Sequence, residues 1–395
     1  MAEPVALIEE GRPAAELLTE LRRAMAEDSA PRLRLLSLRP DDALRHAACA
    51  LLAEVQRWPG NADWTSPLAR KLDTEVGAVV RLLFSAPVDA PLVHTASGSE
   101  SLLLALKAAR DQAQACRRGL AQPCVVAPAS VHPSVDKACQ LLAMRVKRVR
   151  LSAEGRADVD ALAAAIDDDT VALLCSLPSD SRGLCDPVPE IAALAQERGL
   201  WLHVDACLGG YLAPFLRELG KPLPPFDFTL PGVRSLSADL HKYGYAPTGI
   251  STLLLRHRAD RALVTFAFEA WDGYPYRREG VAGTRSLAPL AGAWLTLLAL
   301  GREGFRHRAA AIAATAETLA QAIEASPALR LLSPSEAGLV HLGSRRDRVG
   351  FGHRMTRFRF PGSPTRDPDG FIVCAGHAVL PNELGEFIGA AESVA

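Results

Sequence analysis

The stretch "TVALLCSLPSDSRGLCDPVPEIAALAQERGLWLHVDAC", residues 170–207, decides the fold class. Its two ends, "TVALLCSLPS" and "LWLHVDAC", are apolar strand candidates, and "PVPEIAALAQERG" between them has the apolar spacing of a helix. Strands that are apolar almost throughout and alternate with helices of roughly a dozen residues are typical of a parallel sheet buried on both faces. The stretch therefore predicts an α/β protein whose mostly parallel sheet is covered by helices.

The same alternation continues on both sides of this stretch. Before it, the pattern predicts a helix over "SPLARKLDTEVGAVVRLLF" (66–84), a strand or turn opening a long helix at "LVHTASGSES" (92–101), a strand at "CVVAP" (124–128), a helix at "SVDKACQLLAMRV" (134–146), a strand at "KRVRL" (147–151) and a helix at "DVDALAAAID" (158–167). After it, "SLSADLHKYG" (235–244) and "GISTLLLR" (249–256) predict two short strands. From about residue 290 a long Ala/Leu helix leads into a strand-rich tail. We expect an N-terminal helical segment (1–65), a large domain (66–290) and a smaller C-terminal α+β domain (291–395).

Composition limits the class of partner. The chain has 395 residues, a net charge of -1 and 23% charged residues, so nothing favours nucleic acid or an anionic membrane as a partner. Its apolar stretches are shorter than a membrane span, and its N-terminus lacks the apolar core of a signal peptide, which predicts a cytoplasmic protein. The eight cysteines form no CxxC and no metal-type spacing, so we expect no metal and mostly small, buried, reduced thiols.

A first candidate site is "TASGSES", residues 95–101, at the predicted start of a helix. Free backbone N–H groups and the positive end of a helix suit a phosphate, which Gly98 would let approach closely and Ser99 could contact with its hydroxyl. The alternative is an ordinary Ser-capped helix with a glycine in the turn. The segment matches neither GxxxxGK[ST] nor GxGxxG, which disfavours an NTPase or a dinucleotide enzyme.

A second candidate is Asp205, at the end of the apolar strand "LWLHVD". Active sites of open α/β sheets lie at the carboxyl ends of their strands, and a carboxylate there needs a cationic partner. The alternative is an Asp that caps the next turn. His203 points to the same face as Asp205 and either bonds to its carboxylate or is a satisfied core histidine, which we slightly favour.

A third candidate is Lys242 in "SADLHKYGYAP", residues 237–247. The chain has only six lysines among its 44 Lys and Arg residues, so Lys242 is not one of many interchangeable surface cations. Burial in an apolar, Gly-rich pocket would destabilise the ammonium form and make the amine a nucleophile that forms Schiff bases with carbonyls. The alternative is a surface lysine. A phosphate cradle, a strand-end Asp and a buried Lys, in this order, fit the phosphate, ring nitrogen and aldehyde of pyridoxal 5'-phosphate.

Five longer segments carry a resemblance to a known family: "LWLHVDACLGGYLAPF" (200–215), "LPGVRSLSADLHKYGYAPTGISTLLLR" (230–256), "ASGSESLLLALKAARD" (96–111), "SVHPSVDKAC" (130–139) and "GLCDPVPEIAALAQERG" (183–199). In them the chain resembles the fold-type I pyridoxal-phosphate lyases and group II decarboxylases, and most of all the sphingosine-1-phosphate lyase branch. The resemblance covers roughly residues 66 to 305. It implies an aspartate aminotransferase-like PLP-transferase fold, with a mostly parallel seven-stranded sheet in the large, cofactor-binding domain.

The resemblance also implies roles for individual residues. His132 would stack on the pyridine ring, Cys207 would touch the opposite ring face, and His241 would help to hold the phosphate. The loop "GVAGTRS" (280–286) would reach across a dimer interface to the cofactor of the neighbouring subunit. We therefore expect a homodimer with shared active sites.

Departures from the family pattern bear on the substrate. Thr248 stands where the lyase branch has a second lysine for the substrate phosphate, and "WPGNADW" (58–64) replaces a His-Pro segment with the same role. We expect retro-aldol cleavage of a small, soluble β-hydroxy amine or amino acid. The alternatives are α-decarboxylation, which needs a group such as Arg285 near the substrate carboxylate, and a non-catalytic scaffold. Candidates to move protons are Lys242, a nearby His, and Tyr243, Tyr245, Tyr274 and Tyr276.

Overall fold

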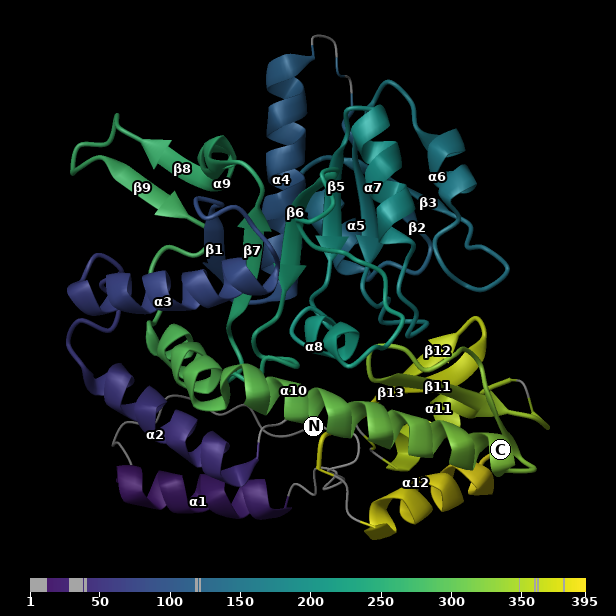
Figure 1. Ribbon diagram of the computed structural model, residues 1–395. Coiled ribbons are helices and arrows are strands. Elements are labelled where there is room, and N and C mark those ends of the chain that lie inside the picture. The colour runs from purple at the N-terminus through teal and green to yellow at the C-terminus, as the bar shows by residue number, and fades with distance from the viewer. Residues whose placement is uncertain are drawn as a thin grey trace, which may run out of the picture.

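The computed structural model describes residues 13–27, 38, 41–117, 120, 122–347, 349–358, 360, 362–378 and 381–395. Its centre is a seven-stranded sheet with the strand order β1-β7-β6-β5-β4-β2-β3 (Figure 1). The strands are β1 (Leu92–Thr95), β2 (Cys124–Pro128), β3 (Arg145–Val149), β4 (Thr170–Ser176), β5 (Trp201–Asp205), β6 (Val233–Ala238) and β7 (Ser251–Leu255). Strands β6, β5, β4, β2 and β3 are parallel, and β7 runs antiparallel to both of its neighbours. The predicted mostly parallel, seven-stranded α/β sheet is confirmed.

Helices cover both faces of this sheet because successive strand residues point to opposite sides. Val125 and Ala127 of β2 join one hydrophobic cluster with α4 (Gly98–Cys116) and α5 (Ser134–Leu141). Val126 joins the other cluster, with α3 (Pro67–Leu83), α6 (Val159–Ala165), α7 (Val188–Glu197) and α8 (Ala213–Glu218). The strands are apolar almost throughout because their side chains pack against a separate layer of helices on each face of the sheet.

The rest of the chain surrounds this unit. On the N-terminal side are α1 (Ala14–Glu27) and α2 (Asp42–Arg57). After β7 come η2 (Arg258–Asp260), α9 (Arg261–Val264), and a hairpin of β8 (Thr265–Phe268) and β9 (Tyr276–Glu279). The C-terminal part contains α10 (Ala288–Ala325), β10 (Leu329–Leu331), β11 (Leu339–Ser344), α11 (Phe351–Met355), η3 (Thr356–Phe358), β12 (Gly362–Arg366), β13 (Asp369–Cys374) and α12 (Pro381–Ser393).

The C-terminal strands form a separate antiparallel sheet in the order β10-β11-β13-β12. This sheet confirms the expected strand-rich tail after a long helix. The domain limits at residues 65/66 and 290/291 stay a prediction. The C-terminal part contacts the part that carries the seven-stranded sheet. Arg156 forms an ion pair with Glu336, and Glu336 Oε2 also accepts a hydrogen bond from the Cys185 N–H at 3.0 Å.

The bounds of three predicted elements were wrong. The strand expected over 235–244 is β6, which ends at Ala238, because residues 240–244 form a turn. The helix expected over 134–146 ends at Leu141, and β3 begins at Arg145 instead of residue 147, because the chain reverses through Ala143 at φ 53°. The long helix α10 is also kinked, since Gly301 has φ 55° and ψ -177° inside it. The kink lets its two halves run in different directions, one along the sheet-bearing unit and the other along the C-terminal strands.

Two further findings concern the whole described chain. All eight cysteines are free thiols, and Cys124, Cys139, Cys175, Cys185 and Cys207 are buried, as expected from the sequence. Among the helices that the structure describes, none combines the length and the apolar character needed to cross a bilayer.

Candidate active site

A cavity of about 150 Å³ lies at the carboxyl edge of the parallel strands. Ser176 of β4, Asp205 of β5 and Ser237 of β6 are in register there, so the three strands end side by side. The cavity is lined by Ser97, Gly98, Ser99, Leu102, His132, Ser134, Ser176, Pro178, Asp180, Asp205, Cys207, Leu208, Asp239 and Lys242. Six of the seven residues predicted from the sequence therefore meet in one place, and the seventh, His241, precedes Lys242.

The start of α4 forms one wall of this cavity. Ser97 is the N-cap but makes no side-chain capping bond, and within the described chain no protein acceptor takes the N–H groups of Gly98 and Ser99. A Cβ on Gly98 would lie 2.4 Å from Cys207 Sγ and 3.0 Å from Asp239 Oδ1, so only glycine fits. Open amides at a helix start, with room in front of them, suit a phosphate group.

Asp205 forms the floor. Its Oδ1 accepts the Cys207 N–H at 3.1 Å and the Ser237 hydroxyl at 3.5 Å, while its Oδ2 has no partner among the described residues. The carboxylate is therefore oriented by one oxygen, and the other is open to a ligand. An acceptor with this geometry suits a protonated ring nitrogen.

His203 does not bond to Asp205. Its Nδ1 lies 2.8 Å from the Ser235 hydroxyl and its Nε2 lies 3.1 Å from the Ser237 hydroxyl. Complete burial lowers its pKa to about 4. His203 is thus a neutral core histidine, the alternative that the sequence slightly favoured, and it acts only indirectly on Asp205 through Ser237.

Lys242 reaches the cavity with its side chain about one-third exposed, and its Nζ lies 3.2 Å from Asp239 Oδ2. Burial lowers the pKa of the amine, but neighbouring acids, Asp239 before Asp205, raise it more, so the net pKa lies above its ordinary value. The prediction of an amine activated by burial was wrong, because it took no account of a carboxylate in contact with the amine.

His132 lies on the rim and has a defined tautomer. Its Nδ1 accepts the Ser134 N–H at 3.1 Å and lies 2.8 Å from the Ser134 hydroxyl, so in the neutral ring Nε2 carries the proton. Cys207, also in the lining of the cavity, donates its thiol to Ser237 at 3.2 Å, and burial raises its pKa well above the ordinary value. Both side chains are therefore held in place before any ligand arrives.

His241 is anchored to the backbone beside the cavity. Its Nδ1 donates to the carbonyl of Ile250 at 2.6 Å, and its Nε2 lies 3.6 Å from Asp239 Oδ2. Thr248, in the same loop, is exposed. The loop that follows β6 thus places His241 and Lys242 on either side of one carboxylate.

The other candidates for proton transfer and carboxylate binding lie outside this cavity. Tyr243 is buried, with its hydroxyl donating to the carbonyls of Gly338 and Ala375, and Tyr245 is buried against Phe305. Tyr274 and Tyr276 belong to the β8–β9 hairpin region. Arg285 donates to the His94 carbonyl and stacks 4.0 Å from the centre of the Trp64 ring, which occupies it structurally.

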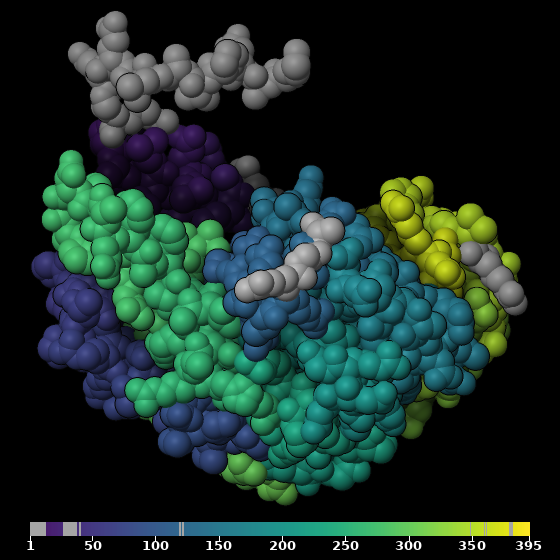
Figure 2. Space-filling view, turned by 90° about the horizontal axis from the view of Figure 1, so that it is seen from above, coloured from purple at the N-terminus to yellow at the C-terminus, as the bar shows by residue number. Residues whose placement is uncertain are grey.

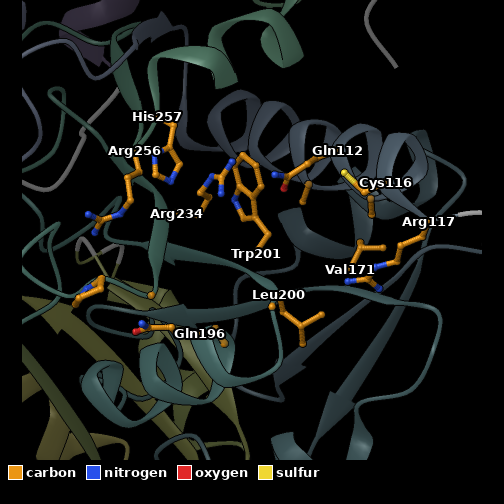
Figure 3. A pocket seen from close by; sticks show the side chains of 16 residues that line it. Gln112, Cys116, Arg117, Val171, Gln196, Leu200, Trp201, Arg234, Arg256 and His257 are labelled. Carbon is orange, nitrogen blue, oxygen red and sulfur yellow. The ribbon is translucent and has the colours of Figure 1, made fainter.

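A larger cavity of about 290 Å³ lies at the opposite edge of the sheet, where β5 begins. Figure 3 shows Arg234, Arg256 and His257 grouped near Trp201 at this place. Arg234 is paired with Asp260 at 2.8 Å, and Arg256 donates to the backbone carbonyls of residues 228, 230 and 233. These cations are already used to hold loops, so the cavity at the carboxyl edge is the better candidate.

Comparisons with known proteins identify the family of the chain. The model of the pyridoxal-dependent decarboxylase conserved domain matches residues 61–343. Sphingosine-1-phosphate lyase 1 of Mus musculus is 37% identical over 293 residues, covering 72% of this chain and 51% of that protein. A probable L-tyrosine/L-aspartate decarboxylase of Methanothermobacter thermautotrophicus is 34% identical over 61% of this chain and 64% of its own length.

A solved structure extends the similarity to nearly the whole chain. The sphingosine-1-phosphate lyase of Burkholderia pseudomallei superposes with a TM-score of 0.91 at 29% identity, covering 99% of this chain and 92% of that chain. The chain spans about half the length of the curated lyase it matches. These matches confirm the family and the fold-type I architecture that the sequence motifs predicted.

Proposed function

The chain belongs to the family of the pyridoxal-dependent decarboxylase conserved domain, and from this premise we propose that it is a pyridoxal 5'-phosphate-dependent carbon–carbon lyase. The reaction is the retro-aldol cleavage of a β-hydroxy amine or amino acid. The observation that carries the proposal is the cavity in which Lys242, Asp205 and the start of α4 meet.

The residues of the cavity fit each part of the cofactor. The free amides of Gly98 and Ser99, with His241 nearby, would hold the phosphate, and the open Oδ2 of Asp205 would face the ring nitrogen. Lys242 would bond to the aldehyde, and His132 and Cys207 would lie on the two ring faces. When bound, the cofactor supplies an electron sink for a bond broken at the amine-bearing carbon of the substrate.

The protein must also manage two protons during a retro-aldol cleavage. The β-hydroxyl of the substrate gives up its proton as the Cα–Cβ bond breaks and the aldehyde leaves, and the remaining carbon takes up a proton. Lys242, once released as a free amine, is placed to accept the proton of the β-hydroxyl, because its contact with Asp239 favours the ammonium form, and then to donate a proton to the remaining carbon. His132, with its hydrogen on Nε2 at the rim, would donate a hydrogen bond to the substrate.

Two features support the lyase over the decarboxylase alternative and bear on the substrate. Arg285, the residue considered for a substrate carboxylate, is engaged with Trp64 and His94. Thr248 is exposed and carries no charge for a phosphate, so we propose a small, soluble substrate. Decarboxylation stays the second candidate, since the relative from Methanothermobacter thermautotrophicus is named a probable decarboxylase. A non-catalytic scaffold would need neither Lys242 nor Asp205 in this cavity.

We further propose a homodimer with shared sites. The β8–β9 hairpin and the adjoining loop expose large apolar side chains: Phe266, Phe268, Trp271, Tyr274 and Val281. Figure 2 shows this green segment at the edge of the molecule, and a second copy of the chain would cover it. The loop 280–286 is tied to the start of α4 by the Val281 N–H, which donates to Glu100 at 2.9 Å. A cytoplasmic location is supported by the eight free thiols.

The test uses one substrate that can react in both ways. The purified chain is loaded with pyridoxal 5'-phosphate, and threo-phenylserine is added as a β-hydroxy amino acid. Retro-aldol cleavage releases benzaldehyde and leaves glycine, whereas decarboxylation releases carbon dioxide and leaves an amino alcohol. We expect a yellow protein with a band near ~420 nm that forms benzaldehyde.

The control separates Lys242 from other lysines. Lys242→Ala should lose both the colour and the product, while Lys221→Ala, which removes only a surface ion pair with Glu317, should keep both. Carbon dioxide without benzaldehyde would select the decarboxylase alternative. A protein that stays colourless with added cofactor would favour the scaffold.

A further inference from the structure

Asp239 is a buried carboxylate of the site that the sequence analysis did not single out. It directly follows β6 and is 3% exposed. Its Oδ2 lies 3.2 Å from Lys242 Nζ and 3.6 Å from His241 Nε2, while its Oδ1 has no hydrogen-bond partner within the described chain. A buried carboxylate with one unsatisfied oxygen is costly unless a cation lies against it, and Lys242 is the cation in contact with it.

The backbone fixes the pair in this arrangement. The Asp239 N–H donates to the carbonyl of Cys207 at 3.1 Å, and the Lys242 N–H donates to the carbonyl of Asp239 at 3.1 Å. The same turn is closed by the Ala246 N–H, which donates to the carbonyl of Leu240 at 2.9 Å. The carboxylate and the amine are therefore carried three residues apart on one tight turn, which keeps the two side chains within reach of each other.

We propose that Asp239 is a positioning residue that holds the free Lys242 side chain as an ammonium ion and thereby sets the pH at which this amine can attack an aldehyde. The inference deepens the proposed function and rests on Lys242 as the amine that binds the cofactor. An ammonium has no lone pair, so it must release one proton to solvent or a base before it can react. Asp239 opposes the release of this proton, because its carboxylate stabilises the positive charge of the ammonium group that it contacts.

The other groups that face Lys242 do not replace Asp239. They come from every neighbouring element: Asp205 and Cys207 from β5 and the turn after it, His132 and Asp180 from the cavity rim, Cys374 from β13, and His241 from the same turn. The thiols of Cys207 and Cys374 are neutral, because burial raises the pKa of each. Asp205 is the remaining buried carboxylate, and it is placed to serve the ring nitrogen.

The experiment follows the Lys242 amine in the chain before cofactor is added. The six lysines are reductively methylated with ¹³C-formaldehyde, the Lys242 resonance is assigned by its loss in Lys242→Ala, and each protein is titrated by NMR. In the wild type we expect the Lys242 signal to stay at its ammonium position up to pH 10.5, the ordinary pKa. In Asp239→Asn the pKa should fall by about one unit or more, since burial then dominates.

Matched variants complete the test. Asp136→Asn removes the same type of charge from a surface pair with Arg148 and should leave the Lys242 titration unchanged. Asp239→Glu keeps the carboxylate and should keep the high pKa. The pH profile for colour development with added cofactor should move to lower pH in Asp239→Asn alone.

A reciprocal variant keeps the inference falsifiable if Asp239→Asn folds poorly. Lys242→Met leaves the buried Asp239 carboxylate without its cation, so that protein should be less stable than the wild type, and adding Asp239→Asn should recover part of the loss. An unchanged Lys242 titration in a folded Asp239→Asn, or a Lys242→Met variant that Asp239→Asn does not stabilise, overturns the inference. Neither result touches the proposed function, which fails instead if Lys242→Ala still develops colour and product.

Discussion

Replacing Gly98 by alanine tests the geometry of the phosphate cradle. The new Cβ would lie 2.4 Å from Cys207 Sγ and 3.0 Å from Asp239 Oδ1. Ordinary contacts between heavy atoms are about 3.5–4.0 Å, so the sulfur or the helix start must move by about 1 Å. Cys207 cannot simply rotate away, because its N–H is bonded to Asp205 and its thiol to Ser237.

The expected magnitude follows from two opposing effects. Overpacking of this kind costs about 1–3 kcal/mol, whereas Gly→Ala in a helix contributes about 0.5–1 kcal/mol of stability. We therefore expect Gly98→Ala to lose about 1–2 kcal/mol of unfolding free energy in chemical denaturation without cofactor. It should also weaken pyridoxal 5'-phosphate binding at least about tenfold, measured by titration of the ~420 nm band.

Two companion variants make the result specific. Gly385→Ala in α12 has no heavy atom within 4 Å of its new Cβ, so it should be neutral or slightly stabilising. Adding Cys207→Ala to Gly98→Ala removes the closest atom and should recover part of the loss, giving a favourable coupling in the double-mutant cycle. If Gly98→Ala is as stable as Gly385→Ala and binds the cofactor normally, the close packing described at the start of α4 is wrong.

Two further predictions concern stability. Asp186 is buried and accepts the N–H groups of Ser176 and Ala157. Burial nevertheless raises its pKa from 3.8 to about 6. The stability that its protonated form contributes is therefore present below pH ~4 and is lost as pH rises through about 6. Wild type should thus lose about 3 kcal/mol across this window relative to Asp186→Asn, as measured by denaturation at several pH values, and parallel pH profiles would contradict this. Arg156 and Glu336 join the two sheet-bearing parts, so a double-mutant cycle with Arg156→Met and Glu336→Gln should give a coupling of about 1 kcal/mol, and additive effects would show that the pair contributes nothing.

Much of the fold was predictable because the strands are buried on both faces and their apolar runs are unmistakable. Once parallel strands were expected, Asp205 at a strand end had to lie at the same edge as the start of the helix at Gly98. The end of α5 was missed, since the apolar spacing continues past Leu141 and nothing in it announces the positive φ at Ala143. Only tertiary packing decides that boundary.

The candidate site was predictable in its members but not in its electrostatics. A single sequence shows that Lys242 is unusual, yet the sign of its pKa shift depends on whether a carboxylate touches the amine. The signal was present as the acid three residues before the lysine in "ADLHK", at the end of a strand. This signal was overlooked because side chains three residues apart are expected to be neighbours in a helix but not in a loop. Here a tight turn brings the two side chains together in the same way. The contact between Arg156 and Glu336 had no local signal at all.

The reversal of β7 has a mechanical consequence for Lys242. Because β7 is antiparallel to β6, residues 239–250 return directly along the same edge instead of crossing over the sheet. The segment that carries the amine is clamped at both ends by ladder pairs, such as Ala238 with Thr252. The ends of the segment can therefore be displaced only if the central sheet itself opens, and rotations of the Lys242 side chain are the simplest way for the amine to travel between bonded and released positions.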